Sequence, residues 1–469
     1  MASAARQPED IPEERVQSLN DEPARRDGDY VLYWMQASVR SRFNHALEYA
    51  LWRANDADQR LLVVFGLTDD YPEANLRHFT FLLEGLADVQ KNLKRRGIKL
   101  VVRRGSPEKV AVEAAKGASL VVTDRGYLRH QRKWRKTVAE AAGCEVVQVE
   151  SDVVVPVEVA SDKREYAART IRPKIKKHLD DFLAALDPIE PQKSSANMSE
   201  EGLDLSDTEA VLSRMKNLDR EVAAVSKLYR GGESEARRVL SDFLDARFSS
   251  YSENRNQPQT DAVSHMSKYL HYGHISPLEV ALAVRDSGAA DQNIDDYLEE
   301  LIVRRELPMN FVYYEPDYDK FSCLPDWAEK TLSKHRDDAR EYSYTRRQLE
   351  DAETHDEYWN AAMRELRYTG YMHNYMRMYW GKKILEWSDT PEYAHQTALY
   401  LNNKYLLDGR DPNSYANVAW IFGVHDQAWK ERPVFGKTRY MAAGGLERKA
   451  KPEEYVKKVD RMVENLTAR

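Results

Sequence analysis

Short apolar runs alternate with longer amphipathic stretches over the first part of the chain. The runs cover residues 30–35, 61–67, 98–105, 119–126 and 144–150 and are rich in Val, Leu and aromatic side chains. The stretches between them have apolar positions at helical spacing. This alternation predicts βαβ units and a parallel, doubly wound, Rossmann-like α/β sheet with helices on both faces. Sheets of this type bind ligands at the carboxyl ends of their strands.

The pattern changes twice along the rest of the chain. Pro, Ser and acidic residues replace the apolar runs after residue 186, and beyond residue 209 almost every periodic segment has helical spacing. The second half is therefore predicted to be mainly α-helical. The organisation that follows is a disordered leader at 1–28, an α/β domain at 29–186, a linker at 187–209 and a helical domain at 210–469.

Composition excludes several classes of protein. A mean hydropathy of −0.71 and the lack of a long apolar run argue against a membrane span. Two cysteines cannot form a disulfide framework, so we expect an intracellular, cytoplasmic protein, near the nucleoid in a prokaryote or in the nucleus or an organelle in a eukaryote. No GxGxxG follows the first apolar run, and GxxxxGK[ST], HExxH and CxxC are absent. A nicotinamide site, an NTPase site and a metal site are not expected.

The net charge of −7 argues against a surface that binds DNA indiscriminately. It leaves room for a local basic groove, because the last seventy residues are rich in Lys and Arg. A solvated charged surface is the alternative interpretation of the same residues.

The segment TGYMHNYMRMYWGKKILEW, residues 369–387, combines an arginine and a histidine with many rings. On a helix, one stripe joins His373, Arg377, Trp380 and Trp387. Ordinary core packing is one interpretation of an aromatic stripe. The arginine weakens it, because a buried guanidinium needs an anionic partner.

Four further segments accompany this helix: SHMSKYLHYGHISP (264–277), YLEELIVRRELPMNF (297–311), DGRDPNSYANVAW (408–420) and FGKTRYM (435–441). Together the five segments resemble the motifs of the photolyase/cryptochrome flavoproteins. The spelling of YMRMYWGKKILEW and LDGRDPN is most similar to class II cyclobutane pyrimidine dimer photolyases. The resemblance runs from about Asp29 to the end of the chain. It implies an α/β domain joined to a helical FAD-binding domain.

The resemblance also implies an activity. In such proteins, reduced FAD excited by blue light passes an electron to a pyrimidine dimer that is flipped out of DNA, and the dimer splits. Asn402 would face the flavin N5, with a helix end or a turn at Asn402–Asn403 as the alternative. The segment around Ser264 would hold the phosphates and ribitol, with a helix cap as the alternative. The residues that would bind FAD are Tyr251, Val263, Ser264, Met266, Ser267, Asn374, Arg377, Asp408 and Asp411, and Arg377 would pair with Asp408.

Electron transfer and substrate contacts follow from the same resemblance. Trp380, Trp359 and Trp387 would carry electrons to the flavin, and Ala419 in place of an aromatic residue agrees with the class II pattern. Many family members stack a tryptophan on the dimer where this chain reads Val303-Arg304, so the clamp must differ there. Glu300 is a surface glutamate in the alternative interpretation. The substrate contacts would be Glu300, Arg255, Met378 and Trp420.

UV-damaged DNA is the expected partner, and the protein is expected to be a monomer. Lys430, Lys437 and Arg439 would neutralise phosphates, and Arg439 could fill the gap that the flipped bases leave. The α/β domain could hold an antenna chromophore, a deazaflavin or a folate. The main alternative is a cryptochrome-like photoreceptor without repair activity, although such proteins often carry a long C-terminal extension and this chain ends at Arg469. A non-catalytic nucleic-acid-binding protein and a dark flavin oxidoreductase are two further hypotheses.

Overall fold

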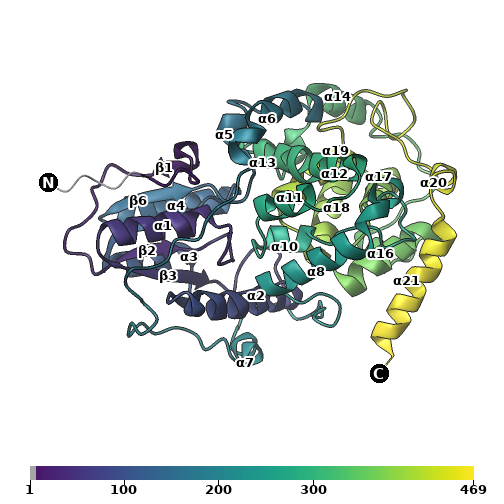
Figure 1. Cartoon of the computed structure of the whole chain (residues 1–469). Coiled ribbons are helices and arrows are strands. Elements are labelled where there is room, and N and C mark those ends of the chain that lie inside the picture. The colour runs from purple at the N-terminus through teal and green to yellow at the C-terminus, as the bar shows by residue number, and fades with distance from the viewer. Residues whose placement is uncertain (1–6, 469) are drawn as a thin grey trace.

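The computed structural model describes residues 7–468 and has two parts, a sheet with flanking helices and a larger assembly of helices (Figure 1). Its sheet has the strand order β1-β6-β5-β2-β3-β4, and every neighbouring pair is parallel except β1 with β6. The predicted parallel α/β architecture is confirmed. The strands are β1 (Val16–Ser18), β2 (Tyr30–Trp34), β3 (Arg60–Leu67), β4 (Lys99–Arg104), β5 (Ala118–Asp124) and β6 (Glu145–Val149).

Alternating residues of each central strand enter two different cores. Val31 and Tyr33 pack with helices α1 and α2, whereas Leu32 and Trp34 pack with α3 and α4 on the opposite face. Both faces are buried, which explains why the strands read as continuous apolar runs. The helices are α1 (His45–Asp56), α2 (Leu76–Arg95), α3 (Pro107–Ala115) and α4 (Arg129–Ala141).

The prediction of a disordered leader over residues 1–28 is wrong for the part that the structure describes. Val16 to Ser18 form the edge strand β1, and Arg15 is 2% exposed. Its guanidinium donates to the carbonyl oxygens of Glu150, Val153 and Val154. Residues 1–6 lie outside the described chain. Ile11 of this segment is buried in the core of the sheet, but one isolated apolar residue in a polar stretch gives no strand or helix pattern in the sequence.

The segment at 187–209 has no strand or helix before α7 (Thr208–Ser213), as expected for a linker. It nevertheless lies along the sheet: Ser195 is buried and donates from its backbone to the Gly97 carbonyl. The domain boundary differs from the expectation as well. Helices α5 (Val157–Ala160) and α6 (Ala168–Phe182) share a core with the helical part, because helical spacing alone does not tell which body a helix packs on.

The helical part has two cores, and the larger one is built around α16 and α17. A π-helical turn, η3 (Glu299–Arg304), interrupts the path from α12 to α13. The other helices are α8 (Glu233–Ala246), α9 (Tyr251–Asn254), α10 (Ser267–His271), α11 (Pro277–Arg285), α12 (Asp291–Leu298), α13 (Arg305–Tyr314), α14 (Asp326–Lys334), α15 (Arg346–Glu350), α16 (Glu357–Thr369), α17 (Asn374–Trp387), α18 (Pro391–Tyr405), α19 (Pro412–Ile421), α20 (Ala443–Glu447) and α21 (Pro452–Thr467).

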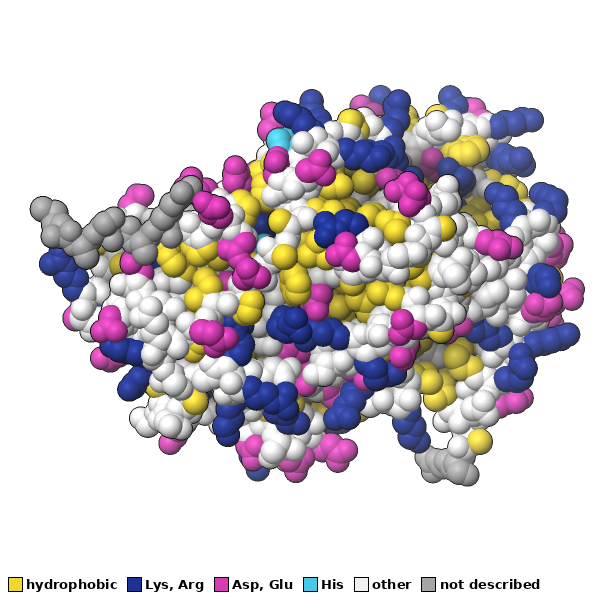
Figure 2. All heavy atoms as spheres, in the orientation of Figure 1, with side chains coloured by type: hydrophobic (Ala, Val, Ile, Leu, Met, Phe, Trp, Pro, Cys, Tyr) yellow, Lys and Arg dark blue, Asp and Glu magenta, His cyan; other side chains and the backbone are white. Residues whose placement is uncertain are grey.

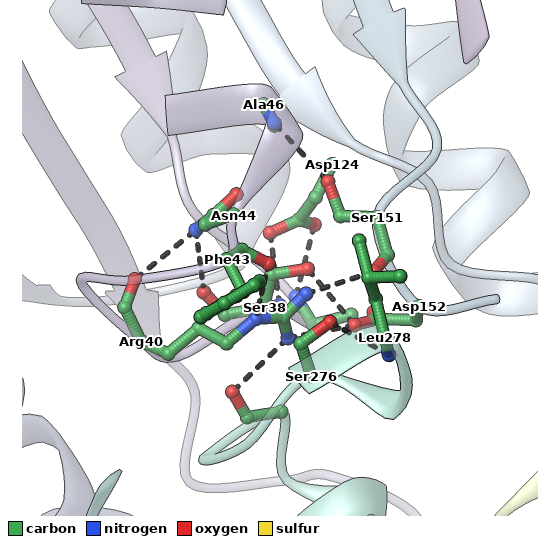
Figure 3. A network of polar contacts seen from close by, with 12 residues as sticks. Ser38, Arg40, Phe43, Asn44, Ala46, Asp124, Ser151, Asp152, Ser276 and Leu278 are labelled. Carbon is green, nitrogen blue, oxygen red and sulfur yellow. Dashed lines mark hydrogen bonds and ion pairs between the residues drawn. The ribbon is translucent and has the colours of Figure 1, made fainter. Parts of the chain in front are cut away.

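A buried polar network joins the two parts near the carboxyl ends of β2 and β5 (Figure 3). Arg40 pairs with Asp152 over 2.8 Å and donates to the carbonyl of Gly273 in the helical part. Asp124 accepts from the backbone N–H groups of the loop after β2, including that of Ser38. A Cβ at Gly273 would lie 1.8 Å from the Ala37 carbonyl, so this close approach requires glycine. The network fixes the loop after β2 against the helical part.

Candidate functional site

Helix α17 carries the arginine that stands out in the sequence, and the structure gives it a carboxylate partner. Arg377 donates from Nη2 to Oδ2 of Asp408 over 3.0 Å and from Nε to the Met372 carbonyl over 2.8 Å. Burial raises the pKa of the Asp408 carboxyl, but the charge of Arg377 outweighs this and holds the pKa below its ordinary value. The predicted ion pair is confirmed, with Asp408 buried and Arg377 half-buried.

Three buried polar atoms around this pair have no hydrogen-bond partner within the described chain. They are Oδ1 of Asp408, Nε1 of Trp380 and Nε2 of His373. Nδ1 of His373 accepts from the backbone of Tyr375, and burial lowers the pKa of this ring to about 3, so Nε2 carries a proton and can donate. Unpaired buried polar atoms are costly. A planar ligand that carries both donors and acceptors, as a flavin ring does, fits this set.

Asn402 lies in α18, three residues before that helix ends, and is 7% exposed. Its amide nitrogen donates to Oδ1 of Asn403 over 3.0 Å. Asn402 therefore lies in the last turn of α18, as the helix-end alternative expected, and not in a separate turn. The amide oxygen of Asn402 takes part in none of the hydrogen bonds found between described residues, so it is available to a ligand.

The segment before α10 presents hydroxyl groups without capping that helix. Oγ of Ser264 accepts from the Tyr297 hydroxyl over 2.9 Å, and the N-cap residue Met266 makes no side-chain cap. Ser267 is exposed and lies close enough to the Asp408 carboxyl to lower its pKa. The segment thus meets the Arg377–Asp408 pair through Ser267. Val263 is half-buried in the same loop.

Three residues of the predicted FAD set occupy different surroundings. Tyr251 is buried in an aromatic cluster with Phe243 and Tyr297. Asn374 is exposed at the start of α17. Asp411 caps α19 through Asn413 and meets Nδ1 of His271 over 3.1 Å, so both of its oxygens are engaged within the protein. Burial raises its pKa, but the bond to His271 outweighs burial and lowers it.

Lys268 is a functional candidate that sequence reasoning missed. It is 1% exposed, and its Nζ lies 3.9 Å from the Tyr229 ring centroid and donates to the His265 carbonyl. Burial lowers its pKa to about 7, with Asp408 opposing and Arg377 adding to that shift. A lysine after SHMS gives no sign of burial in the sequence, because most lysines are exposed.

The three tryptophans pack in one continuous row, which we call the indole file. The rings of Trp359 and Trp380 are stacked, with centroids 6.4 Å apart and an interplanar angle of 7°. Trp359 also meets Trp387 edge-on at 5.6 Å, and its Nε1 donates to the Trp380 carbonyl. Each of the three is at most 4% exposed. Trp359 of α16 therefore stands between the two tryptophans of α17, and Trp380 is the member that carries an unpartnered N–H, one helical turn from Arg377.

The predicted substrate contacts Glu300, Arg255, Met378 and Trp420, which we call the candidate substrate face, come from four elements of the helical part. Glu300, in the π-helical turn, pairs with Nη1 of Arg255 over 2.8 Å, and its side chain is 42% exposed. Met378 and Trp420 are half-buried. π-helical turns are frequent at functional sites. Arg304, at the position where family members place a tryptophan, is exposed and pairs through Nε with Glu299.

The predicted DNA contacts surround a loop between α19 and α20. Lys430 and Lys437 are exposed, whereas Arg439 is half-buried. The guanidinium of Arg439 pairs with Asp426 and lies 4.2 Å from the Trp429 ring centroid and 5.5 Å from that of Trp420. Arg439 is therefore held beside Trp420, and Trp429 is an exposed ring that sequence reasoning did not select.

A cavity of about 130 Å³ lies at the carboxyl ends of β2 and β3, where the fold class predicts a ligand. Its lining includes Gln36, whose amide oxygen and nitrogen are buried and unpartnered within the described chain, and Trp134. It also includes His271 and Arg410 of the helical part. The cavity is thus bounded by both parts of the molecule.

Comparison with known proteins decides the family. A DNA photolyase family model matches residues 31–193. A deoxyribodipyrimidine photo-lyase of Methanothermobacter thermautotrophicus is 51% identical over 95% of this chain and 98% of its own length. A deoxyribodipyrimidine photo-lyase of Oryza sativa is 40% identical over 93% of this chain and 88% of its own length. The chain belongs to the deoxyribodipyrimidine photolyase family. The resemblance stated from the motifs is confirmed, and membership implies a flavin cofactor.

Solved structures show the photolyase fold at lower identity. A class III photolyase of Agrobacterium tumefaciens aligns with a TM-score of 0.73 and 20% identity over 92% of this chain and 86% of that one. A Synechocystis cryptochrome aligns with the same TM-score of 0.73 at 17% identity, over 93% of this chain and 89% of that one. The fold is therefore shared by photolyases and cryptochromes, so function must be argued from the residues of the site.

Neither a metal site nor a helix able to span a membrane is found in the described part of this photolyase. No group of three or more His, Cys, Asp or Glu side chains within residues 7–468 is arranged to hold a metal ion. In the same range, no helix has both the length and the apolar character that crossing a membrane requires.

Proposed function

We propose that this photolyase splits cyclobutane pyrimidine dimers in UV-damaged DNA, using blue light and reduced FAD. The observation that carries the proposal is the file of three indoles that ends beside the buried Arg377–Asp408 pair. Bound beside this pair, reduced FAD would supply the electron that splits the dimer and would recover it afterwards.

The buried pair and its neighbours hold and orient the flavin. His373 Nε2–H and the Asn402 amide oxygen are a donor and an acceptor on two different elements of the helical part. The Asp408 carboxylate stays ionised because Arg377 compensates its burial. The hydroxyl groups of Ser264 and Ser267, with the backbone N–H groups beside them, suit phosphate oxygens.

The indole file keeps the cofactor reduced. An electron moves from Trp387 through Trp359 to Trp380, and Trp380 is the member of the file nearest to Arg377 along α17. The short ring separations and the low exposure of the three rings favour transfer along this path. The residues at the substrate face have a different role. Trp420 stacks on the extruded bases, Glu300 and Arg255 contact their polar edge, and Met378 packs against them.

The cavity at the ends of β2 and β3 is the proposed antenna site. An apolar lining with one unpartnered amide, that of Gln36, suits a flat heteroaromatic ring that needs a few oriented hydrogen bonds. A deazaflavin and a folate both meet this description. We further propose a monomer that works inside the cell, where damaged DNA is found and where two unpaired cysteines remain reduced.

The test is the loss of cyclobutane dimers from UV-damaged DNA, measured with purified, chemically reduced protein under blue light and in darkness. Loss of dimers in the light alone supports the proposal. Flavin photoreduction without loss of dimers would favour a cryptochrome-like photoreceptor. Protein that carries no flavin would contradict both functions and would favour a non-catalytic DNA-binding protein. Loss of dimers in darkness would contradict the light-driven step.

A further inference from the structure

Helix α6 presents a row of basic side chains that no part of the proposed site uses. Arg169, Lys176 and Lys177 are exposed, and Arg172 is partly exposed on the same helix. The apolar face of α6, with Ile171 and Ile175, is buried in the core of the helical part. We define the α6 ridge as Arg169, Arg172, Lys176 and Lys177.

Few acidic groups compensate this ridge. Glu299 pairs with Arg172 over 2.7 Å and also with Arg304, so one carboxylate serves two guanidinium groups. Lys174, on the inner side of the ridge, is paired with Glu165. Among residues 7–468, no ion pair involves Arg169, Lys176 or Lys177. The row ends at Asp180 and Asp181, so the uncompensated charge runs from Arg169 to Lys177.

The ridge is continuous with the candidate substrate face through two sets of contacts. Glu299, which anchors Arg172 and Arg304, directly precedes the candidate substrate residue Glu300 in the π-helical turn. On the other side, Tyr166 lies just before α6 and donates from its hydroxyl to the carbonyl of Asp426, the residue that pairs with Arg439.

Tyr166 itself is an exposed aromatic residue beside the start of the ridge. Tyr166 is 45% exposed and its hydroxyl accepts from Nε1 of Trp327, so the ring is held in place at the surface. Figure 2 shows Lys and Arg side chains gathered along the upper edge of the molecule, where Figure 1 places α6 and α14. Interleaved basic and aromatic side chains are typical of a surface that follows a nucleic-acid strand.

We propose that the α6 ridge binds the phosphates of the DNA arm on one side of the lesion. This inference rests on the proposed function, because it needs DNA at the substrate face. The segment from Arg169 to Lys177 rises about 12 Å along the helix. That rise matches three to four base pairs of duplex at about 3.4 Å each. Charge complementarity and continuity with the substrate face identify DNA as the occupant.

The test compares two variants of the whole chain that lose the same charges. The ridge variant is Arg169→Gln, Lys176→Gln and Lys177→Gln. The control is Lys91→Gln, Lys94→Gln and Arg95→Gln, three exposed residues on α2 at the opposite edge of the molecule (Figure 1). Binding is measured by fluorescence anisotropy on dimer-containing duplexes with about ten base pairs on both sides of the lesion, or with either side trimmed to about three.

The ridge variant should bind the full duplex more weakly than wild type, with a salt dependence of log K flatter by about 0.9 for each phosphate that is no longer neutralised. Trimming one arm should weaken wild type and the control, whereas the ridge variant should no longer respond to trimming of that same arm. Flavin content and photoreduction should not change. A ridge variant that behaves like the control overturns the inference. Wild type that does not prefer dimer-containing DNA overturns the inference together with the proposed function, and this outcome is recognised without any variant.

Discussion

The indole file and the substrate face differ in how they are held. Trp359, Trp380 and Trp387 are almost fully buried and fixed by ring packing. The substrate face is held by partly exposed charge pairs such as Arg255 with Glu300 and Arg439 with Asp426. Packing distances hardly respond to salt, whereas exposed pairs are screened and individually weak. Electron transfer to the flavin should therefore be insensitive to solution conditions, and recognition of DNA should respond strongly to them.

Of the substitutions that separate the two regions, Trp359→Phe should have the largest effect, and it acts on photoreduction of the flavin. The ring that joins Trp380 to Trp387 is replaced by one that is harder to oxidise, so photoreduction of the flavin should fall to near background. Transient absorption of the oxidised protein measures this. The DNA affinity should not change, because α16 contributes nothing to the substrate face. Trp52→Phe in the α/β part is the control. Undiminished photoreduction in the variant would show that electrons enter by another path.

Asp408→Asn should remove the flavin. The substitution leaves the Arg377 guanidinium without its carboxylate, and breaking such a pair costs about 3 kcal/mol of stability or more. The absorbance of purified protein near the flavin bands and a thermal melt measure the two losses. Glu235→Gln breaks the exposed pair with Arg238 and should cost less than about 1 kcal/mol. Equal effects of the two substitutions would mean that the buried pair does not hold the cofactor.

Trp420→Ala should weaken binding of dimer-containing DNA by about 1–3 kcal/mol, through lost stacking on the extruded bases. The loss should be the same at low and at high salt, whereas Arg439→Gln should flatten the salt dependence by about 0.9. Anisotropy at several salt concentrations separates the two. A salt-dependent loss for the tryptophan variant would show that its ring acts by positioning Arg439 rather than by stacking.

The effect of Lys382→Met is on stability, and it should depend on pH. Lys382 is buried under Trp420, and burial lowers its pKa to about 7. Between pH 7 and about 10.4 the unfolded chain binds a proton that the folded chain does not, so this lysine makes stability rise with pH. The gain in melting temperature of the variant over wild type should therefore be greatest below pH 7 and shrink toward pH 10. Lys94→Met on α2 gives the baseline, and a pH-independent difference would contradict the assignment.

The sheet could be predicted from sequence because buried parallel strands are continuous apolar runs, as at residues 61–67. The strand β1 could not, because VQS is short and polar and is held by pairing with β6. The Arg377–Asp408 pair was predicted correctly from motifs, although the burial of Lys268 was not. Burial of a lysine depends on residues far away in the chain, here Tyr229 and Tyr371.

The order of the three tryptophans along the indole file could not be predicted from the sequence either. Trp380 and Trp387 are seven residues apart on one helix, which is a rise of about 10.5 Å and too far for ring contact. Their shared stripe was predictable from spacing. The position of Trp359 between them depends on how α16 packs against α17, and no local pattern in the sequence records that packing.

The most direct test of the account uses one variant in two redox states. Dimer loss under blue light is measured for wild type and for Trp359→Phe, each starting with oxidised and with chemically reduced flavin. The account predicts repair in every case except the oxidised variant, because the indole file reduces the flavin but takes no part in splitting the dimer. Repair by the oxidised variant, or its failure when the flavin is already reduced, would contradict that division of roles.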